Sequence, residues 1–317
     1  MSVSLQQTPP ANTGKEGDRN KLMKRLHSSN GIALAIIWAV SILVFAMFIA
    51  IIINLLIQGF QHAKGGMPLL LQPAFYSGDP SVGIGGELFN TIYILILSEI
   101  FLFPIALGAA IFTVEYAPQG LLISFIRFAA ETLAGVPSIV LGLFGFLIFS
   151  QVFHLGVSRL SGSLTLLCLN FPQGLRLFED ALASVPKEAR EGSLALGCSK
   201  WYMIRTVVLP SALPGIITGL ILTAGKIVGE TAALIFTMGV TNPIGGNVFT
   251  LNPLITSDNL TIHLWSLKTQ DLPSYLTGDQ ASSIAAASAT ILIVILLVLN
   301  ISARTIGRAI QRRVMAA

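Results

Sequence analysis

Long apolar runs alternate with shorter polar segments along this chain of 317 residues. Most of these runs approach the roughly 20 residues that an α-helix needs to cross the hydrocarbon core of a bilayer. The first run carries no charged residue and is too long for the apolar part of a cleaved signal peptide. The pattern predicts an all-α integral membrane protein with six transmembrane helices, at 31–57, 90–113, 133–153, 161–176, 211–240 and 283–303.

Two of the predicted spans contain helix-breaking residues. The fourth span holds Pro172 and Gly174, and the fifth holds Pro214, Gly215, Gly219, Gly225 and Gly229. Proline and glycine are tolerated in membrane helices where neighbouring helices cover the freed backbone groups. Interrupted helices often line a transport pathway, but close helix packing on small residues explains the same pattern, and both readings stay open.

The few charged residues orient the helices. Only 11% of the residues are charged, against about 25% in soluble globular proteins. With the N-terminus inside, nearly all Lys and Arg fall in the inside segments, which are the N-terminal tail, 114–132, 177–210 and the end from Arg304. The outside segments, 58–89, 154–160 and 241–282, hold only Lys64, Arg159 and Lys268. This asymmetry predicts that both termini are cytoplasmic and that the number of spans is even.

Three polar segments lie outside the predicted helices. Residues 1–30 are polar and predict a disordered tail, whose basic end at 21–27 fits a positive-inside anchor better than a nucleic-acid patch. We therefore expect a lipid bilayer and no nucleic acid as its partner. The long outside segments 65–87 and 241–282 are rich in Gly, Pro, Ser, Asp and Asn. Composition leaves open whether they are passive linkers or present a surface.

The sequence shows no pattern of a catalytic or metal centre. Cys168 and Cys198 have no second Cys or His at metal-ligand spacing. No phosphate-binding G-x-x-x-x-G-K-[ST] loop is present, and the spans hold no paired carboxylates or Cys/His pair at catalytic spacing. We therefore expect no enzyme activity, no catalytic residue, no metal and no cofactor bound by this chain.

The inside loop at about 184–210 is longer than a connector needs to be. Two short helical patterns are hinged at Gly197: the first runs from Lys187 to Leu196, and the second follows Ser199 as N-cap. The second pattern places Trp201, Ile204 and Val208 at helical spacing on one face, and Pro210 predicts its end or a kink. Such an amphipathic pair either lies in the lipid interface or docks a partner protein.

The spacing within this loop resembles the EAA signature of ABC importer permeases: E-A-A, three residues, Gly, nine residues, Ile, any residue, Leu-Pro. Gly192 and Ser193 stand in place of the two alanines, and Val207 stands in place of isoleucine. The resemblance implies a type I ABC importer permease fold with one transmembrane domain at 31–317. It also implies an ATPase-docking role for Glu191, Gly192, Ser193, Gly197, Trp201, Leu209 and Pro210.

Three further stretches resemble phosphate permease subunits of the PstA type: ETLAGVPSIVLGLFG from Glu131, ALASVPKEAREGSLALG from Ala181, and GKIVGETAALIFTMG from Gly225. The PstC-type sister subunit shares several of these features and remains an alternative. The resemblance implies a bacterial or archaeal inner-membrane protein that pairs with a PstC-type permease. Two PstB-type ATPases would bind ATP and Mg²⁺, and a PstS-type protein would deliver phosphate from outside.

The fifth predicted span carries Lys226 and Glu230, one helical turn apart. Because a charge at mid-membrane costs roughly 2.5–3.5 kcal/mol on insertion scales, such residues usually face a pathway or a partner. We expect Lys226 to contact phosphate transiently, with Glu230 moderating its binding; a structural ion pair is the alternative. PstA-type proteins more typically have arginine in place of Lys226, and lysine lacks the planar fork that grips phosphate at two points.

Three more residues are candidates for the substrate path: Arg176, at the end of the fourth span; Glu131, at the start of the third; and Ser138, where a broken turn after Pro137 would expose backbone N–H groups. Arg176 is equally explained as a positive-inside anchor, and Glu131 as a rim residue that packs against the EAA loop. Glu99 is a lone acid in the second span, with Lys226, the sister subunit or a proton as its expected partner.

Two other functions fit less well. Sulfate, molybdate or phosphonate as cargo would keep the same mechanism, because no physical feature of the sequence reads the identity of the anion. A self-sufficient secondary carrier usually shows internal repeats, which this sequence lacks, and it would not need the EAA loop.

Overall fold

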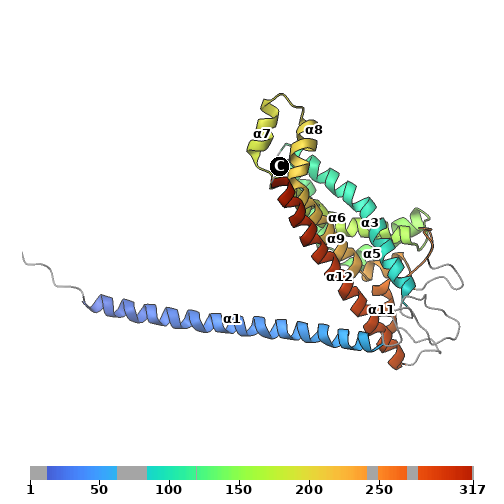
Figure 1. The fold of residues 1–317 in the computed structure, drawn as a ribbon, viewed down its shortest axis with the longest axis horizontal. Helices are drawn as coiled ribbons and strands as arrows, with labels where there is room; N and C mark the ends of the chain where they lie inside the picture. Colours follow the sequence, from blue (N-terminus) through green and yellow to red (C-terminus); the bar gives the residue numbers. More distant parts are fainter. Residues whose placement is uncertain (1–12, 63–83, 119, 241–248, 270–277, 316–317) are drawn as a thin grey trace, which may run out of the picture. The chain divides into compact units, whose positions relative to one another are not determined.

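The computed structural model describes residues 13–62, 84–118, 120–240, 249–269 and 278–315, and the regular structure in these ranges is helical (Figure 1). The chain divides into two compact units, residues 1–54 and 55–317, which are described separately. The first unit contains most of α1 (Thr13–His62), whose apolar part at 30–59 is long enough to cross a membrane. The helix starts within the segment 1–30 that we expected to be disordered, because residues such as Leu22 and Met23 are good helix formers.

The second unit contains three further helices that are long and apolar enough to span a membrane. A fourth candidate in this unit is a broken pair whose two halves are bent by 101°. The described chain thus has four candidate spans, or five with the bent pair, instead of the six that we predicted. The single spans are α3 (Gly85–Ile111) with the π-helical turn η2 (Phe112–Tyr116), the continuous helix Lys200–Gly229, and the 284–307 part of α12 (Gly278–Met315); the bent pair joins α4 (Leu121–Ala134) to α5 (Ser138–Gly145) and the π-helical turn η3 (Phe146–Val152).

The predicted fourth span differs most from the structure. It forms α6 (Arg159–Ala183), which runs through Pro172 and Gly174 without a break but is too polar to count as a candidate span. This helix packs against α3, α4 and α5, so protein rather than lipid surrounds most of its length. Several of its buried polar side chains donate hydrogen bonds to the backbone of the same helix, as Thr165 does to Ser161 O and Asn170 to Leu166 O. A helix in this position does not need an apolar sequence.

The predicted fifth span is shifted toward the N-terminus. Its helix begins with α8 (Lys200–Met203), continues through the π-helical turn η4 (Ile204–Val208) and becomes α9 (Leu209–Gly229). Pro210 therefore does not end the helix, which was one of the two outcomes that we expected, because the wider i→i+5 turn before it accommodates a residue that lacks an N–H. The helix ends at Gly229, and Glu230 is extended (φ −77°, ψ 128°) before the short helix α10 (Ala232–Thr237) begins.

The main core of the second unit lies between α3, α6 and α9. Ile94, Leu166 and Phe178 are buried in it, with Phe178 edge-on to Phe103 at 5.7 Å between ring centroids. Gly215 allows α9 to approach α6 closely, because a Cβ at this position would lie 2.7 Å from the side chain of Ala181. For Gly215, the structure therefore supports close helix packing rather than the lining of a transport pathway.

Arg159 is fully buried, although we expected it in an outside loop. Its guanidinium donates hydrogen bonds to Asn90 Oδ1, to Thr250 O and to Ser257 Oγ, and it lies 4.9 Å from the centre of the Tyr93 ring. These contacts fasten residues 249–259 to the start of α3. The described part of the segment 241–282, which also forms α11 (Leu260–Thr269), is therefore built onto the helices and is not a passive linker.

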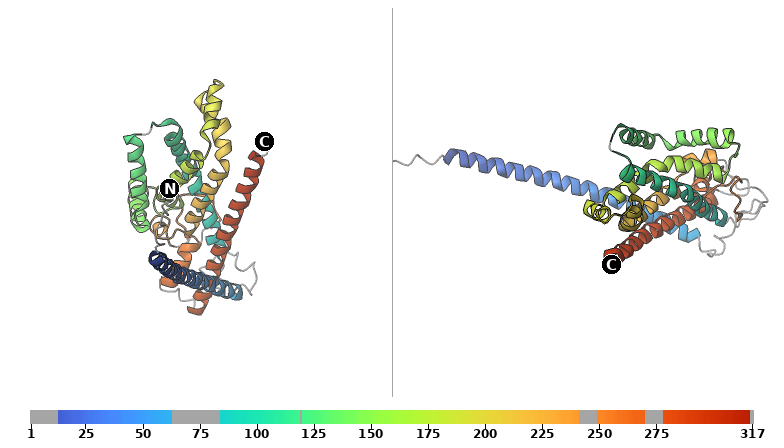
Figure 2. Two further views of the ribbon diagram at one scale, coloured as in Figure 1. Left: turned by 90° about the vertical axis from the view of Figure 1, so that its left-hand side faces the viewer. Right: turned by 90° about the horizontal axis from the view of Figure 1, so that it is seen from above.

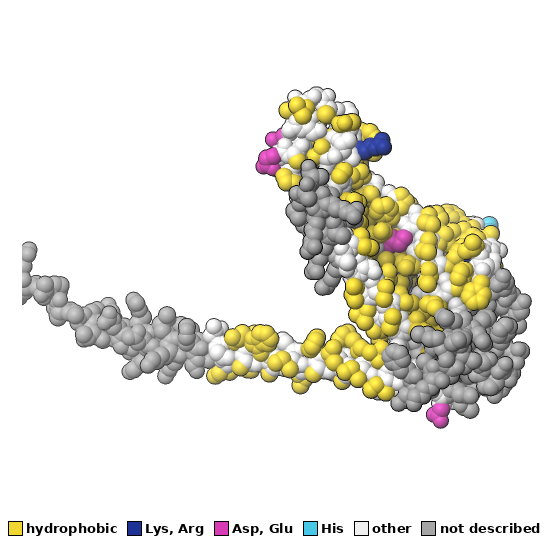
Figure 3. Space-filling model, in the orientation of Figure 1, with side chains coloured by type: hydrophobic (Ala, Val, Ile, Leu, Met, Phe, Trp, Pro, Cys, Tyr) yellow, Lys and Arg dark blue, Asp and Glu magenta, His cyan; other side chains and the backbone are white. Residues whose placement is uncertain are grey.

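A helical loop projects at one end of the second unit. It contains α7 (Lys187–Ala195) and α8, and it rises beyond the neighbouring helices in Figure 1 and in the left view of Figure 2. Hydrophobic side chains cover much of the described surface in Figure 3, whereas acidic and basic side chains appear together around this projecting end. On this face the projecting loop thus carries charged side chains of both signs.

Candidate functional site

The coupling loop, defined here as residues 184–210, is a helix–turn–helix. Its first helix, α7, follows Pro186, and its second helix, α8, starts after Ser199, whose hydroxyl accepts a hydrogen bond from Tyr202 N at 3.3 Å. Gly197 lies between them with φ +82°, a left-handed conformation that glycine adopts without strain. The two predicted helices, the N-cap and the hinge are therefore confirmed.

The loop exposes the groups expected of a docking surface. Trp201 is 56% exposed and Leu196 is 85% exposed, and the candidate docking residues Glu191, Gly192 and Gly197 are exposed as well. Ile204 and Val208 are fully buried, whereas Trp201 is exposed, so the three side chains that we placed on one apolar face do not all belong to the exposed surface. The difference arises because Trp201 lies on α8 in the projecting loop, whereas Ile204 and Val208 lie on η4, which packs against the core. Ser193 and Leu209 are half-buried at the edge of this surface, and Pro210 is exposed.

Arg190 fixes the coupling loop to the helical bundle, a role that sequence reasoning missed. Its guanidinium donates to Glu115 Oε1 at 3.0 Å and to the backbone oxygens of Leu182, at 2.7 Å, and Val185. The side chains of Arg190 and Glu115 are 16% and 5% exposed. Next to this pair, Lys200 Nζ lies 5.2 Å from the centre of the Tyr116 ring. The end of the α3–η2 helix thus holds both helices of the loop.

An inner cavity of about 480 Å³ lies between α4 and α6, near the coupling loop. It brings together two of the predicted path residues, Arg176 and Glu131, and adds Arg127 and Glu179. Arg127 Nε lies 3.6 Å from Glu179 Oε2, and Thr113 Oγ1 donates to the other oxygen of Glu179. Arg176 is exposed and makes no ion pair within 4.0 Å among the described residues. Within the described residues, Arg176 is therefore a cation without an ion pair in a lining that also holds three carboxylates, those of Glu131, Glu179 and Asp180.

Ser138 lies at the bend between the two halves of the broken pair. The backbone turns after Ala134, and α5 begins at Ser138 with Pro137 as its extended N-cap. The amides of Gly135 and Val136 bond back to carbonyls of α4, and those of Val140 and Leu141 bond to Pro137 O. The broken turn that we predicted is present, but Ser138 does not line the inner cavity.

Lys226 and Glu230 lie at the opposite end of α9 from the coupling loop. They do not share a helical face as we predicted, because the helix ends between them at Gly229. Glu230 Oε1 instead accepts a hydrogen bond from Ala233 N at 3.3 Å, at the start of α10, and its backbone oxygen accepts one from Thr261 Oγ1 at 3.0 Å. Lys226 is exposed, and within the described residues it has no ion pair shorter than 4.0 Å.

Glu99 has a partner that we did not consider. Its Oε1 accepts a hydrogen bond at 2.7 Å from the hydroxyl of Thr223, which lies on α9 one turn before Lys226. The other oxygen, Oε2, is buried without a hydrogen-bond partner in the part of the chain that is described. This contact ties the middle of α3 to α9 close to Lys226.

Comparison with known proteins identifies the family. A family model described as "Binding-protein-dependent transport system inner membrane component" matches residues 102–316. The chain is 39% identical over 242 residues to the probable ABC transporter permease protein YqgI of Bacillus subtilis, covering 74% of this chain and 81% of the relative. It is 31% identical over 230 residues to the phosphate transport system permease protein PstA of Mycobacterium leprae, covering 71% and 72%.

The fold also has counterparts among solved structures. A chain in the crystal structure of a bacterial alginate ABC transporter in complex with alginate pentasaccharide-bound periplasmic protein superimposes with a TM-score of 0.60. The superposition covers 94% of this chain and 97% of that chain at 17% sequence identity, and so it shows a shared fold only. The family match spans more than half of the sequence, so this protein belongs to the binding-protein-dependent transport system inner membrane components, the multi-pass permease subunits of ABC importers.

Proposed function

We propose that this chain is a PstA-type permease subunit of an ATP-driven importer of inorganic phosphate. The observation that carries the proposal is the exposed coupling loop with EAA-type spacing, in a chain that matches a PstA protein over 71% of its length. Phosphate rather than sulfate, molybdate or phosphonate is favoured by this relative and by the ETLAGVPS and GETAALIF stretches. A PstC-type identity is the nearest alternative within the same complex.

The partners follow from the surfaces that the chain presents. The coupling loop offers Trp201 and Leu196 to a groove on a PstB-type ATPase, which would bind ATP and Mg²⁺. The α4 helix exposes large apolar side chains, including Leu121, Phe125 and Phe128, that need cover from lipid or from a PstC-type sister subunit. A PstS-type binding protein would dock at the far end, beside α11. In this arrangement both termini are cytoplasmic and the chain lies in the bacterial or archaeal inner membrane.

The path residues form two groups at different depths. Lys226 and Glu230 lie near α11 and would form the outer group, while Arg176, Glu131 and the inner cavity lie near the coupling loop. Hydrogenphosphate is an anion, and its passage requires cationic or donor groups that hold it weakly enough to release it. Lys226 would meet the anion first, Ser138 would offer backbone amides at the bend, and Arg176 would meet it last. Glu230 and Glu131 would limit the strength of binding by their negative charge.

The hinge of the coupling loop provides the test of ATPase docking. Replacing Gly197 by valine places a β-branched residue at φ +82°, which costs about 1–2 kcal/mol or forces the hinge to open. Either response changes the angle between α7 and α8. We expect the Gly197→Val chain, purified with its sister subunit from membranes, to carry several-fold less ATPase than the wild type does.

Gly192 offers a matched control in the same loop. It lies within α7, has ordinary helical geometry and has open space around its Cα, so alanine fits there and restores one residue of the EAA signature. Gly192→Ala should therefore retain the ATPase. Full ATPase recovery with Gly197→Val, or a wild-type chain that purifies without any ATPase, would contradict the docking role.

A further inference from the structure

Three potential metal ligands meet where the start of α3 faces the start of α11. Glu87 lies on the first turn of α3 and His263 on the first turn of α11, and Asp258 lies one residue before the helix cap Asn259. Asn259 Oδ1 accepts a hydrogen bond from Ile262 N at 2.9 Å and so fixes where α11 begins. The residue before a helix cap lies beside the fourth residue of the helix, which brings Asp258 next to His263.

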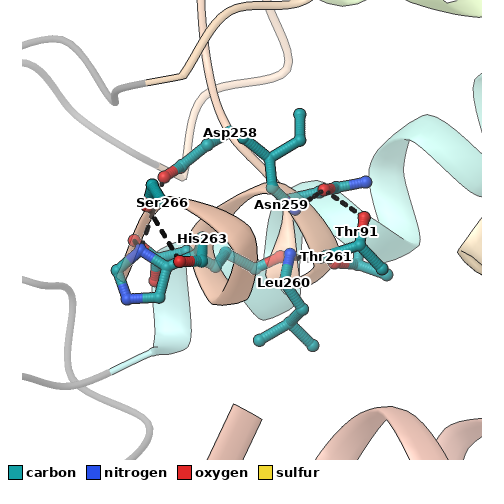
Figure 4. Close-up of polar contacts among 9 residues, drawn as sticks. Thr91, Asp258, Asn259, Leu260, Thr261, His263 and Ser266 are labelled. Atoms are coloured by element: carbon teal, nitrogen blue, oxygen red, sulfur yellow. Dashed lines mark hydrogen bonds and ion pairs between the residues drawn. The ribbon is translucent and has the colours of Figure 1, made fainter. Parts of the chain in front are cut away.

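Thr91 joins the two helix starts. Its hydroxyl donates to Glu87 O at 2.7 Å and accepts a hydrogen bond from Leu260 N at 3.0 Å. Figure 4 shows Asp258 and His263 together on one side of the α11 start, with Thr91 holding the other side. The ligand groups are therefore positioned by two helices that are hydrogen-bonded to each other, and not by a loose loop.

The distances suit a small divalent ion. His263 Nδ1 lies 3.5 Å from Asp258 Oδ2 and 3.9 Å from Glu87 Oε1, and one donor atom from each residue lies within 4.8 Å of the others. Metal–ligand bonds of about 2.0–2.2 Å in tetrahedral geometry separate neighbouring ligand atoms by about 3.4 Å. Small side-chain movements would therefore close the three atoms around one ion.

Burial and charge also favour a cation at this place. Asp258 is 2% exposed, and its Oδ1 has no hydrogen-bond partner among the described residues. A buried carboxylate oxygen without a donor, next to the second buried carboxylate of Glu87, is a position that a metal ion would satisfy.

We propose that Glu87, Asp258 and His263 bind one divalent metal ion, Zn²⁺ or Mn²⁺, which ties the start of α3 to α11. One imidazole and two carboxylates suit these metals better than they suit Ca²⁺ or Cu⁺. The site lies about 40 Å along the α3–η2 helix from Glu115, at roughly 1.5 Å per residue, and thus at the end opposite the coupling loop. The metal would stabilise the outer end of the fold, whatever anion the importer carries.

Metal loading of the purified protein tests the proposal without any transport assay. The full chain is purified through a tag that contains no histidine, together with the subunits that co-purify. Bound metal is then removed with a chelator in phosphate-free buffer. It is then loaded with Zn²⁺ or Mn²⁺, desalted and analysed for metal content and Tm. We expect the wild type to hold one more metal ion per chain than His263→Gln or Asp258→Asn, and to gain a metal-dependent rise in Tm that both variants lose. Affinity should fall at least about tenfold in each variant.

His154 supplies the control for adventitious binding, because it is an exposed histidine outside the cluster. His154→Gln should keep the full metal content and the full rise in Tm. Equal metal content in the wild type and in Asp258→Asn would overturn the proposal, as would losses of the same size in His154→Gln. If the variants do not fold, the visible spectrum of the Co²⁺-loaded wild type decides: tetrahedral N/O coordination supports the site, and a spectrum of hydrated Co²⁺ overturns it.

Discussion

Replacing Lys226 by methionine should lower ATP-driven phosphate uptake at least about tenfold, a change that corresponds to about 1.4 kcal/mol. Methionine keeps an unbranched side chain and removes the only charge that Lys226 offers to an anion. The loss should appear in uptake and not in assembly, because a cation in the last turn of α9 stabilises the helix by only about 0.3–1 kcal/mol. Uptake of labelled phosphate into proteoliposomes, normalised to assembled complex, measures the effect.

Two variants separate charge from packing at this position. Lys226→Arg keeps the cation, and we expect it to retain most of the uptake or to increase it, because the guanidinium grips phosphate at two points. Lys268→Met removes an exposed lysine of α11 that contacts Ser282, and it should leave uptake unchanged. Normal uptake by a correctly assembled Lys226→Met complex would remove Lys226 from the path.

Replacing Arg190 by alanine should destabilise the coupling loop and disconnect ATP hydrolysis from transport. The change leaves Glu115 buried without its cation and removes the donor for Leu182 O and Val185 O. Breaking one side of a buried ion pair costs about 3–5 kcal/mol, less here because Arg190 is partly exposed. We expect Tm to fall by several degrees and phosphate uptake per ATP hydrolysed to fall several-fold.

The control for this prediction is Arg205→Ala, which removes an exposed arginine of the same loop and should leave Tm unchanged. The double variant Arg190→Ala with Glu115→Ala removes both charges, and it should be more stable than the sum of the two single changes predicts. Additive losses, or an unchanged Tm for Arg190→Ala, would show that the pair does not hold the loop.

Local signals in the sequence predicted the coupling loop well. Pro186, Ser199 and Gly197 each act within a few residues, as helix start, N-cap and hinge, and the structure places each one accordingly. Pro210 was predicted to end or to kink the helix, and the structure rules out the first of these outcomes. A proline normally stops a helix, and only the π-helical turn before it, which depends on packing against the core, lets the helix continue.

Features that depend on distant residues were not predictable. α6 is polar because other helices surround it, and an apolarity pattern cannot reveal its neighbours. Arg190 pairs with Glu115, which lies on another helix, and Glu87 lies beside His263, which is distant from it in the sequence. Arg176 and Glu131 were chosen from separate motifs, and only the fold shows that they line one cavity. Lys226 and Glu230 fit helical spacing, but the helix ends between them.

The most direct test of the account is ATP-driven uptake of labelled phosphate into proteoliposomes. The vesicles contain this chain with its candidate sister permease, ATPase and binding protein, and excess unlabelled sulfate serves as the competitor. We expect uptake that requires ATP and persists in sulfate. Vesicles that take up sulfate but not phosphate, still driven by ATP, would leave the ABC permease family intact and contradict the assignment of phosphate as cargo.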